Sequence, residues 1–138
     1  MTSLLNKILK TLKNLCDKDS VEWIEGTLSD NFTVYDSSSN STFKYTKVGN
    51  IGGIRGVITP SDTLEGGTSD HEIGTIPEGY RPYANQYFLC QGSGKYTWLL
   101  KITYDGIVSM QRYGNSSGYS DCKNGTWLPF CVTWIIGR

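Results

Sequence analysis

Three consecutive side chains, Gln111, Arg112 and Tyr113, combine two planar polar groups with an aromatic ring. They end an apolar run, and a loop rich in Gly and Ser leads on to Tyr119. A ring face stacks on the C–H groups of a sugar, while amide and guanidinium groups bond its hydroxyls. The residues therefore predict a saccharide site at a strand end. The alternative is that they are ordinary rim residues of a strand.

Acidic side chains around a long loop were the obvious candidates for glycan cleavage. They are Asp62, Glu65, Asp70, Glu72 and Glu78. A sugar-cleaving site needs two carboxylates that face each other across the bond. The spacing of these residues does not predict such a pair. In addition, carboxylates in loops usually face solvent and stabilise turns. No serine lies in a nucleophile elbow either, so the sequence predicts no enzyme.

Neither a metal nor a cofactor site is predicted. The chain has one histidine and four cysteines without a CxxC pair, which argues against zinc. A glycine-rich stretch at residues 92–97 lacks the Ser or Thr that must follow the lysine of a phosphate loop. Cys90 and Cys131 lie in apolar runs and are expected to pack as reduced thiols. A Cys122–Cys131 bridge across a hairpin stays open, as does the oxidation state of any pair.

The charge balance excludes other classes of partner. The formal net charge of the 138 residues is zero, whereas a nucleic-acid binder needs a basic face. The N-terminal segment has apolar residues interrupted by Lys7, Lys10 and Lys13, so no signal peptide is expected. No run approaches the roughly 20 apolar residues of a membrane span. We therefore expect synthesis in the cytoplasm and no membrane insertion.

Residues 2–17 predict a helix. Leu5, Ile8, Leu12 and Leu15 form an a/d heptad seam. One interpretation is a short oligomeric coiled coil, compatible with three strands, and the other is an amphipathic helix that lies on its own domain. Two heptads are too short to stand alone in water. A coiled coil here must be supported by contacts between the domains that follow.

After residue 20 the apolar period changes to that of strands. Short alternating runs with turn residues between them predict an antiparallel β-sandwich or β-barrel. The expected strands are residues 21–25, 32–35, 43–48, 51–58, 73–76, 85–91, 95–104, 107–113 and 127–136. The predicted organisation is thus an N-terminal oligomerising helix at residues 1–20 and a mainly β domain at residues 21–138.

A proline corner connects the two halves of the β domain. It runs from Thr75 to Tyr83 and contains Pro77, Gly79 and Pro82. Each proline fixes its own φ and holds the residue before it in an extended conformation. Pro77 and Gly79 predict a type II turn with Pro77 at its first central position. The corner is therefore expected to be a rigid connection between strands.

The order of these features resembles a known family. A glycine-rich strand (residues 47–58) is followed by a long loop, the corner Ile76-Pro77-Glu78-Gly79-Tyr80-Arg81-Pro82, a hairpin turning on Gly106 and a C-terminal strand. This order is similar to that of the C-terminal head domains of tailed-phage receptor-binding, baseplate and tail-fibre proteins, such as the lactococcal siphophage heads. The resemblance covers roughly residues 28–138.

The resemblance implies a homotrimeric head on a helical stem, placed at the tail tip or baseplate of the virion. It also implies binding to host cell-wall saccharides and contacts with other phage tail proteins. The candidate contacts are His71, Tyr83, Trp98, Lys101, Gln111, Arg112 and Tyr113, in roles of stacking and of bonding hydroxyl or phosphate groups. Two other functions stay open: a structural baseplate or fibre module that binds protein, and a glycan-cleaving enzyme.

Overall fold

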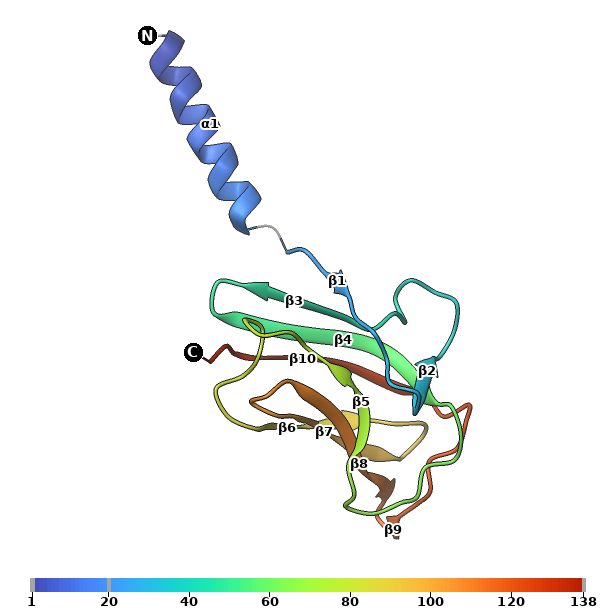
Figure 1. Ribbon diagram of the computed structural model, residues 1–138. Coiled ribbons are helices and arrows are strands. Elements are labelled where there is room, and N and C mark those ends of the chain that lie inside the picture. The colour runs from blue at the N-terminus through green and yellow to red at the C-terminus, as the bar shows by residue number, and fades with distance from the viewer. Residues whose placement is uncertain (1, 20, 138) are drawn as a thin grey trace.

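A computed structural model describes residues 2–19 and 21–137, with side chains for residues 2–14 and 21–137. Figure 1 shows one N-terminal helix that leads into two stacked β-sheets. The helix, α1, spans Thr2–Asp19. The predicted boundary at residue 20 lies outside the described residues. Among the described residues, no helix is both long and apolar enough to cross a membrane.

Two antiparallel sheets form the β domain. Sheet A has the order β1 (Ile24–Glu25), β3 (Lys44–Val48), β4 (Ile51–Pro60) and β10 (Leu128–Ile135), with β2 (Phe32–Val34) also paired to β4. Sheet B has the order β5 (His71–Thr75), β8 (Ile107–Asn115), β7 (Thr97–Ile102) and β6 (Gln86–Gln91), with β9 (Gly118–Tyr119) paired to β8. The predicted fold, a mainly antiparallel β domain after a single helix, is confirmed.

The core lies between the two sheets. Alternation along β7 points Trp98, Leu100 and Ile102 inward, and all three are fully buried. They meet Ile54 of β4 and Phe130 of β10, and the rings of Trp98 and Phe130 pack edge to face at 6.1 Å. This apolar layer fixes which face of each strand remains for function.

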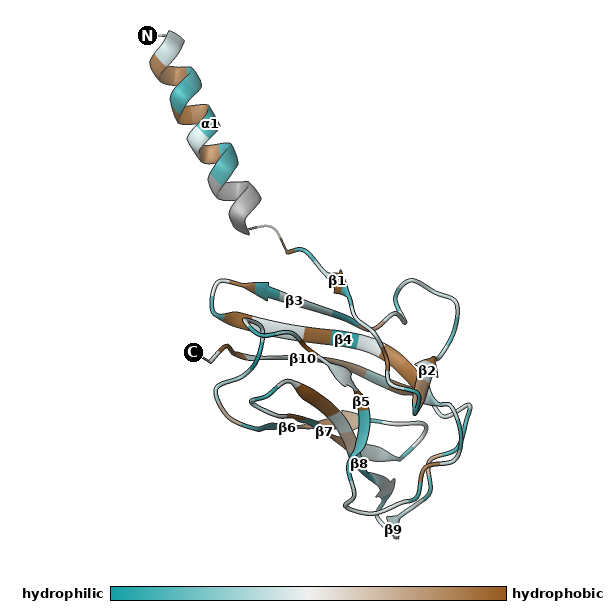
Figure 2. Ribbon diagram, viewed as in Figure 1, coloured by the Kyte–Doolittle hydropathy of each residue, from teal (hydrophilic) through white to brown (hydrophobic). Residues whose placement is uncertain are grey.

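The helix does not pack along the sheets. Every side chain described for it is exposed, including Leu5 at 57%, Ile8 at 48% and Leu12 at 53%. Apolar and polar residues alternate around its length (Figure 2). The interpretation in which the helix lies on its own domain is therefore wrong for residues 2–14, whose described side chains are not covered by the β domain.

The proline corner contains a turn one residue later than predicted. Tyr80 donates its backbone N–H to the carbonyl of Pro77 over 3.2 Å, so Glu78 and Gly79 are the central residues. Gly79 has a φ of 91°, as the second central position of a type II turn requires. Pro77 is thus the first residue of the turn, and the prediction that placed it in the centre is wrong.

Both sheets hold the corner. Ile76 donates its N–H to Gly106 in the hairpin between β7 and β8, and the indole Nε1–H of Trp134 in β10 donates to the carbonyl of Tyr80 over 2.7 Å. Gly52 of β4 lies beneath this second bond. A Cβ atom at Gly52 would lie 2.5 Å from Trp134 Nε1 and 2.9 Å from Tyr80 O. The glycine-rich strand therefore permits the close approach that anchors the corner.

The described cysteines are free thiols. Cys90 and Cys122 are buried, and burial raises the pKa of each thiol to about 11. The side chain of Cys131 is exposed, so the prediction that it packs in the core is wrong. Its strand position explains this result, because Cys131 lies on the outer face of β10 between the inward-facing Phe130 and Val132.

We expect Gly52→Ala to destabilise the domain by roughly 2 kcal/mol, in the range of an overpacked core. The added methyl group must displace either the Trp134 indole or the Tyr80 carbonyl. Urea denaturation followed by tryptophan fluorescence measures the change. Gly53→Ala is the matched control, since a Cβ atom there meets its neighbours only at 3.5 Å. Equal stabilities of the two variants would contradict this account of the anchor.

Candidate functional site

The outer face of sheet B, turned away from the core, carries most of the chemistry. Directly opposed residues of an antiparallel sheet project on the same side. Two such rows cross this face, namely Glu72, Ser109, Lys101 and Tyr87, and beside it Gln111, Leu99 and Leu89. Leu89 is 77% exposed and Tyr87 is 56% exposed. The face therefore has a polar side towards β8 and an apolar, aromatic side on β6.

Asp70 forms hydrogen bonds with side chains of both β7 and β8. One carboxylate oxygen accepts a hydrogen bond from Lys101 Nζ at 2.8 Å, and the other accepts one from Gln111 Nε2 at 2.7 Å. The side-chain amide of Gln111 is buried and needs hydrogen-bond partners. Its Nε2 donates to Asp70, and its Oε1 accepts a hydrogen bond from Arg112 Nε. The hydrogen bond with Asp70 raises the pKa of Lys101, with a smaller contribution from Tyr87.

Arg112 has a strained backbone. Its φ is 58°, the only positive value at a non-glycine residue among those described. The register between β7 and β8 shifts here, because the four residues from Gln111 to Gly114 face the three residues from Thr97 to Leu99. Such a bulge re-aims a side chain, and bulges are frequent beside functional sites. The bulge sends Arg112 outward, and its neighbour Tyr113 inward.

The Arg112 guanidinium is held in one position at the surface. Its Nε donates to Gln111 Oε1 at 2.8 Å, and an Nη donates to the hydroxyl of Tyr119 in β9 at 3.0 Å. Arg112 is exposed, and Tyr119 is 55% exposed. The result is a surface where a fixed cation, a phenol and a carboxylate–amide pair lie side by side.

The long loop before β5 completes this surface. Leu64 exchanges two backbone hydrogen bonds with Cys122, Gly66 N–H donates to the Asp121 carboxylate, and Gly67 accepts from the N–H of Arg112. These bonds hold the loop against β8 and the segment after β9. Asp70, at the end of the loop, is thereby fixed in position before any ligand binds.

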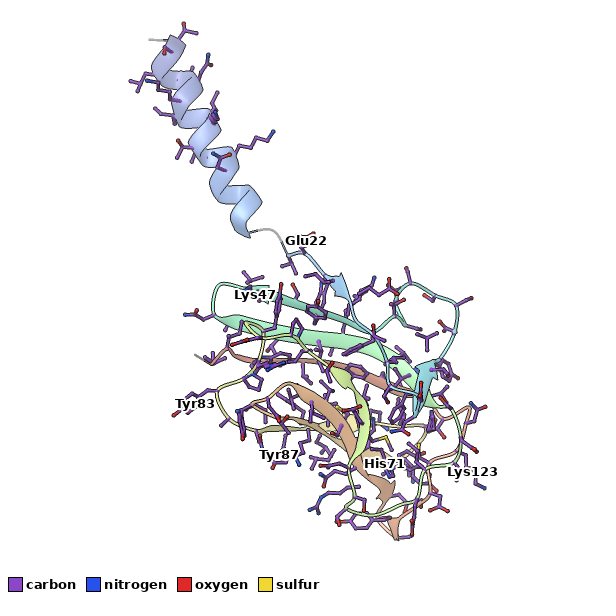
Figure 3. The ribbon with its side chains drawn as sticks, viewed as in Figure 1. Glu22, Lys47, His71, Tyr83, Tyr87 and Lys123 are labelled. Atoms are coloured by element: carbon purple, nitrogen blue, oxygen red, sulfur yellow. The ribbon has the colours of Figure 1, made fainter. Side chains whose placement is uncertain are left out.

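Some of the predicted contact residues belong to the Asp70 network, and the others lie away from it or are buried. Lys101, Gln111 and Arg112 come together in the Asp70 network. His71 lies at the sheet edge with Nε2 2.9 Å from the carbonyl of Glu65, and Tyr83 lies well apart from it, in the loop before β6 (Figure 3). The structure therefore brings three of the seven predicted residues into one network.

Three predicted contacts are buried, and of these only Gln111 belongs to the network, where it positions Asp70 and Arg112. Trp98 is fully buried and donates its indole N–H to the carbonyl of Gln91. Tyr113 is 7% exposed, and its ring stacks on Tyr96 at 4.9 Å. For Trp98 the cause is strand alternation, and for Tyr113 it is the bulge at Arg112.

Other residues of the surface were not predicted. Tyr87 and Leu89 could have been found from the sequence, because they alternate with the more buried Phe88 and Cys90 along β6. Asp70 and Tyr119 gave no local signal, since both reach the network through pairing that is distant in sequence. Chemically, the site offers charged donors, an acceptor and ring faces. The described His, Cys, Asp and Glu residues contain no group of three that could hold a metal ion.

Comparison with known proteins places this geometry in a fold. No family model and no curated protein matches the sequence. Among solved structures, the receptor-binding protein gp15 of Listeria phage PSA superimposes with a TM-score of 0.61 at 15% identity, over 92% of this chain and 76% of that one. The head domain of lactococcal phage bIL170 gives a TM-score of 0.55 at 15% identity, over 85% of this chain and 99% of that one.

The chain has the fold of phage receptor-binding heads. The likeness inferred from the glycine-rich strand, the proline corner and the hairpin at Gly106 is thus confirmed. At 15% identity, this similarity shows the fold alone and does not identify ligand contacts.

We expect Arg112→Gly to be more stable than Arg112→Ala by about 1 kcal/mol. Both variants remove the side chain, so the difference reports only the cost of a left-handed backbone. Urea denaturation measures it. At Leu89, in the regular part of β6, the order should reverse, because glycine weakens a strand by roughly 0.5–1 kcal/mol relative to alanine. If the Arg112→Ala variant is as stable as the Arg112→Gly variant, or more stable, the backbone of Arg112 is not strained.

Proposed function

We propose that the chain is the receptor-binding head of a tailed phage and recognises saccharides of the host cell surface without cleaving them. The observation that carries this proposal is the pre-formed Asp70–Gln111–Arg112–Tyr119 network on the outer face of sheet B. The fold is shared with a Listeria phage receptor-binding protein and a lactococcal phage head domain. On this proposal the chain is a virion component of the tail tip or baseplate and contacts other tail proteins.

The network suits a polyol ligand. Arg112 and Lys101 supply donors with full charge, Asp70 supplies acceptors, and charge-assisted bonds of this kind are about twice as strong as neutral ones. Tyr87 and Tyr119 add exposed rings for stacking. Since the loop and the bulge already hold these groups in place, little conformational entropy is lost when a sugar binds.

Cleavage fits the same residues poorly. Both oxygens of Asp70 accept hydrogen bonds from Lys101 and Gln111, which leaves this carboxylate as a fixed acceptor. Glycosidases use a second carboxylate across the scissile bond, and within the described residues no other carboxylate bonds to this network. A structural module that binds protein remains the second candidate, because Leu89 and Tyr87 would also suit a protein surface.

Arg112→Ala and Tyr87→Ala should each weaken binding to host wall polysaccharide at least tenfold, about 1.4 kcal/mol. Biolayer interferometry on polysaccharides purified from a panel of Listeria and Lactococcus strains provides the measurement. Tyr35→Ala is the matched control, because Tyr35 is 43% exposed but follows β2 in sheet A. Wild-type chain that binds no polysaccharide in the panel would favour the protein-binding module. Release of reducing ends during incubation would favour an enzyme.

We also propose that three copies assemble through α1. Leu5, Ile8, Leu9 and Leu12 are exposed and form an apolar stripe along the helix. An isolated helix of this length is only marginally stable in water, and such a stripe marks an interaction surface. A trimer would cover this stripe and raise the avidity of weak sites without new contacts. Because α1 leads into β1 at the edge of sheet A, the stem would attach to the layer opposite the binding face (Figure 1).

Light scattering should give three times the 15.4 kDa of the chain. Ile8→Glu should lower the mass towards one chain, because it places a charge in the apolar stripe. Lys10→Glu, on the outer side of the helix, should leave the mass unchanged. A wild-type monomer would overturn the stem-and-head arrangement, and a stable dimer would overturn the copy number alone.

A further inference from the structure

The proline corner encloses a second concave site. A cleft of about 140 Å³ opens there, and it is lined by Glu78, Gly79, Arg81, Pro82, Tyr104 and Gly137. Tyr104 belongs to the hairpin at one end of β8, whereas Arg112 lies five residues beyond Ile107 along that strand. At about 3.3 Å per residue, the two sites are separated by more than the length of one sugar ring. The cleft is therefore distinct from the Asp70 network.

Backbone bonds make this cleft rigid. The turn at Glu78 and Gly79 is closed by the bond from Tyr80 N–H to the Pro77 carbonyl. Arg81 donates Nε–H to the Ile76 carbonyl at 3.0 Å, and Gly137 donates its N–H to the Arg81 carbonyl at 2.9 Å. A site held in this way binds with little loss of conformational freedom.

The polar groups of the cleft are not consumed by the fold. Within the described part of the chain, the Glu78 carboxylate makes no ion pair, since the single pair found there joins Lys101 to Asp70. Glu78 is exposed, and Arg81 is half-buried and uses its Nε for the corner. Glu78 and Arg81 thus line the same cleft without pairing to each other. A third charged group, Lys47 Nζ, lies beside the turn, 3.7 Å from where a Cβ atom at Gly79 would be.

Two exposed aromatic rings flank these groups. Tyr104 lines the cleft and is 66% exposed, and Tyr83 is 81% exposed. The backbone of Tyr83 abuts Gly137, where an added Cβ atom would collide with it, so Tyr83 lies at the rim. Neither ring belongs to the hydrophobic core. Packing therefore does not explain why two large rings are held at the surface of so rigid a corner.

We propose that this corner cleft binds a pyranose ring. Glu78 accepts hydrogen bonds from ring hydroxyls, Arg81 donates to a ring or hydroxyl oxygen, and Tyr104 stacks on the C–H face. This inference rests on the proposed receptor-binding function and extends it, because a second weak site on each copy would engage another residue of the same polysaccharide.

Titration of the ¹⁵N-labelled full chain tests the cleft directly. The probes are methyl α-D-glucopyranoside, methyl α-D-galactopyranoside, methyl α-L-rhamnopyranoside and N-acetylglucosamine, each to about 50 mM, well above the roughly millimolar dissociation constant of a weak site. At least one should shift the amides of Gly79, Tyr104 and Gly137 in a saturable way. If none of the four sugars moves these amides, the proposal is overturned.

Glu78→Gln and Tyr104→Ala should each weaken this saturable shift at least fivefold, while their spectra remain those of the folded domain. Glu22→Gln is the matched control, as it neutralises an exposed glutamate that does not line the cleft. Unchanged affinity in both cleft variants would overturn the assignment of these residues.

Arg112→Ala separates the two proposals. It should leave the shifts at Gly79 and Gly137 intact even where it abolishes binding to wall polysaccharide. Loss of both signals together in that folded variant would show that there is only one site and would overturn the cleft. Sugar shifts at the cleft in a wild-type chain that binds no wall polysaccharide would support the cleft and contradict the receptor-binding role alone.

Discussion

The hydrogen bond from the Trp134 indole to the carbonyl of Tyr80 is the contact on which the arrangement of the domain depends. It ties the proline corner to β10 of sheet A, and the bond from Ile76 to Gly106 ties the same corner to the hairpin of sheet B. One irregular segment thus fixes the two layers relative to each other. The bond exists only because Gly52 has no side chain beneath it. Gly52 lies near the start of β4, where a glycine weakens the strand itself but permits this tertiary contact.

Much of this fold could be predicted from the sequence, since the deciding signals were local. Alternation located nine of the ten strands within a few residues, and only β9 was missed, because its two residues pair within a Ser- and Gly-rich segment. The turn at the corner was predicted one residue early. Proline is favoured at the first central position of type II turns, but here the positive φ falls on Gly79 with Pro77 outside the centre. Glycine placement proved the stronger constraint.

The site was less predictable, since its geometry depends on contacts distant in sequence. Gln111 and Lys101 were named from their chemistry, but the acceptor that unites them is Asp70, brought in by a loop that is hydrogen-bonded to Cys122 and Arg112. No local pattern reports that docking. The left-handed conformation of Arg112 was equally hidden, because arginine has no preference for positive φ. Trp98 illustrates the opposite error: its chemistry suited a sugar, yet strand alternation along β7 places it in the core.

The two sheets differ in what they carry, and this difference follows from the place at which the chain enters the β domain. The helix precedes β1 at the edge of sheet A, so the layer nearest the helix carries the glycine-rich β4 and the anchor of the corner. Sheet B is left with one face in the core and one free face, on which loops and a bulge hold polar groups in position. Because the core side of these strands is fixed by Trp98, Leu100 and Ile102, the free face can change its side chains at little cost to stability. A domain built in this way can change the side chains of its free face without altering its fold, which is consistent with the same architecture at 15% identity.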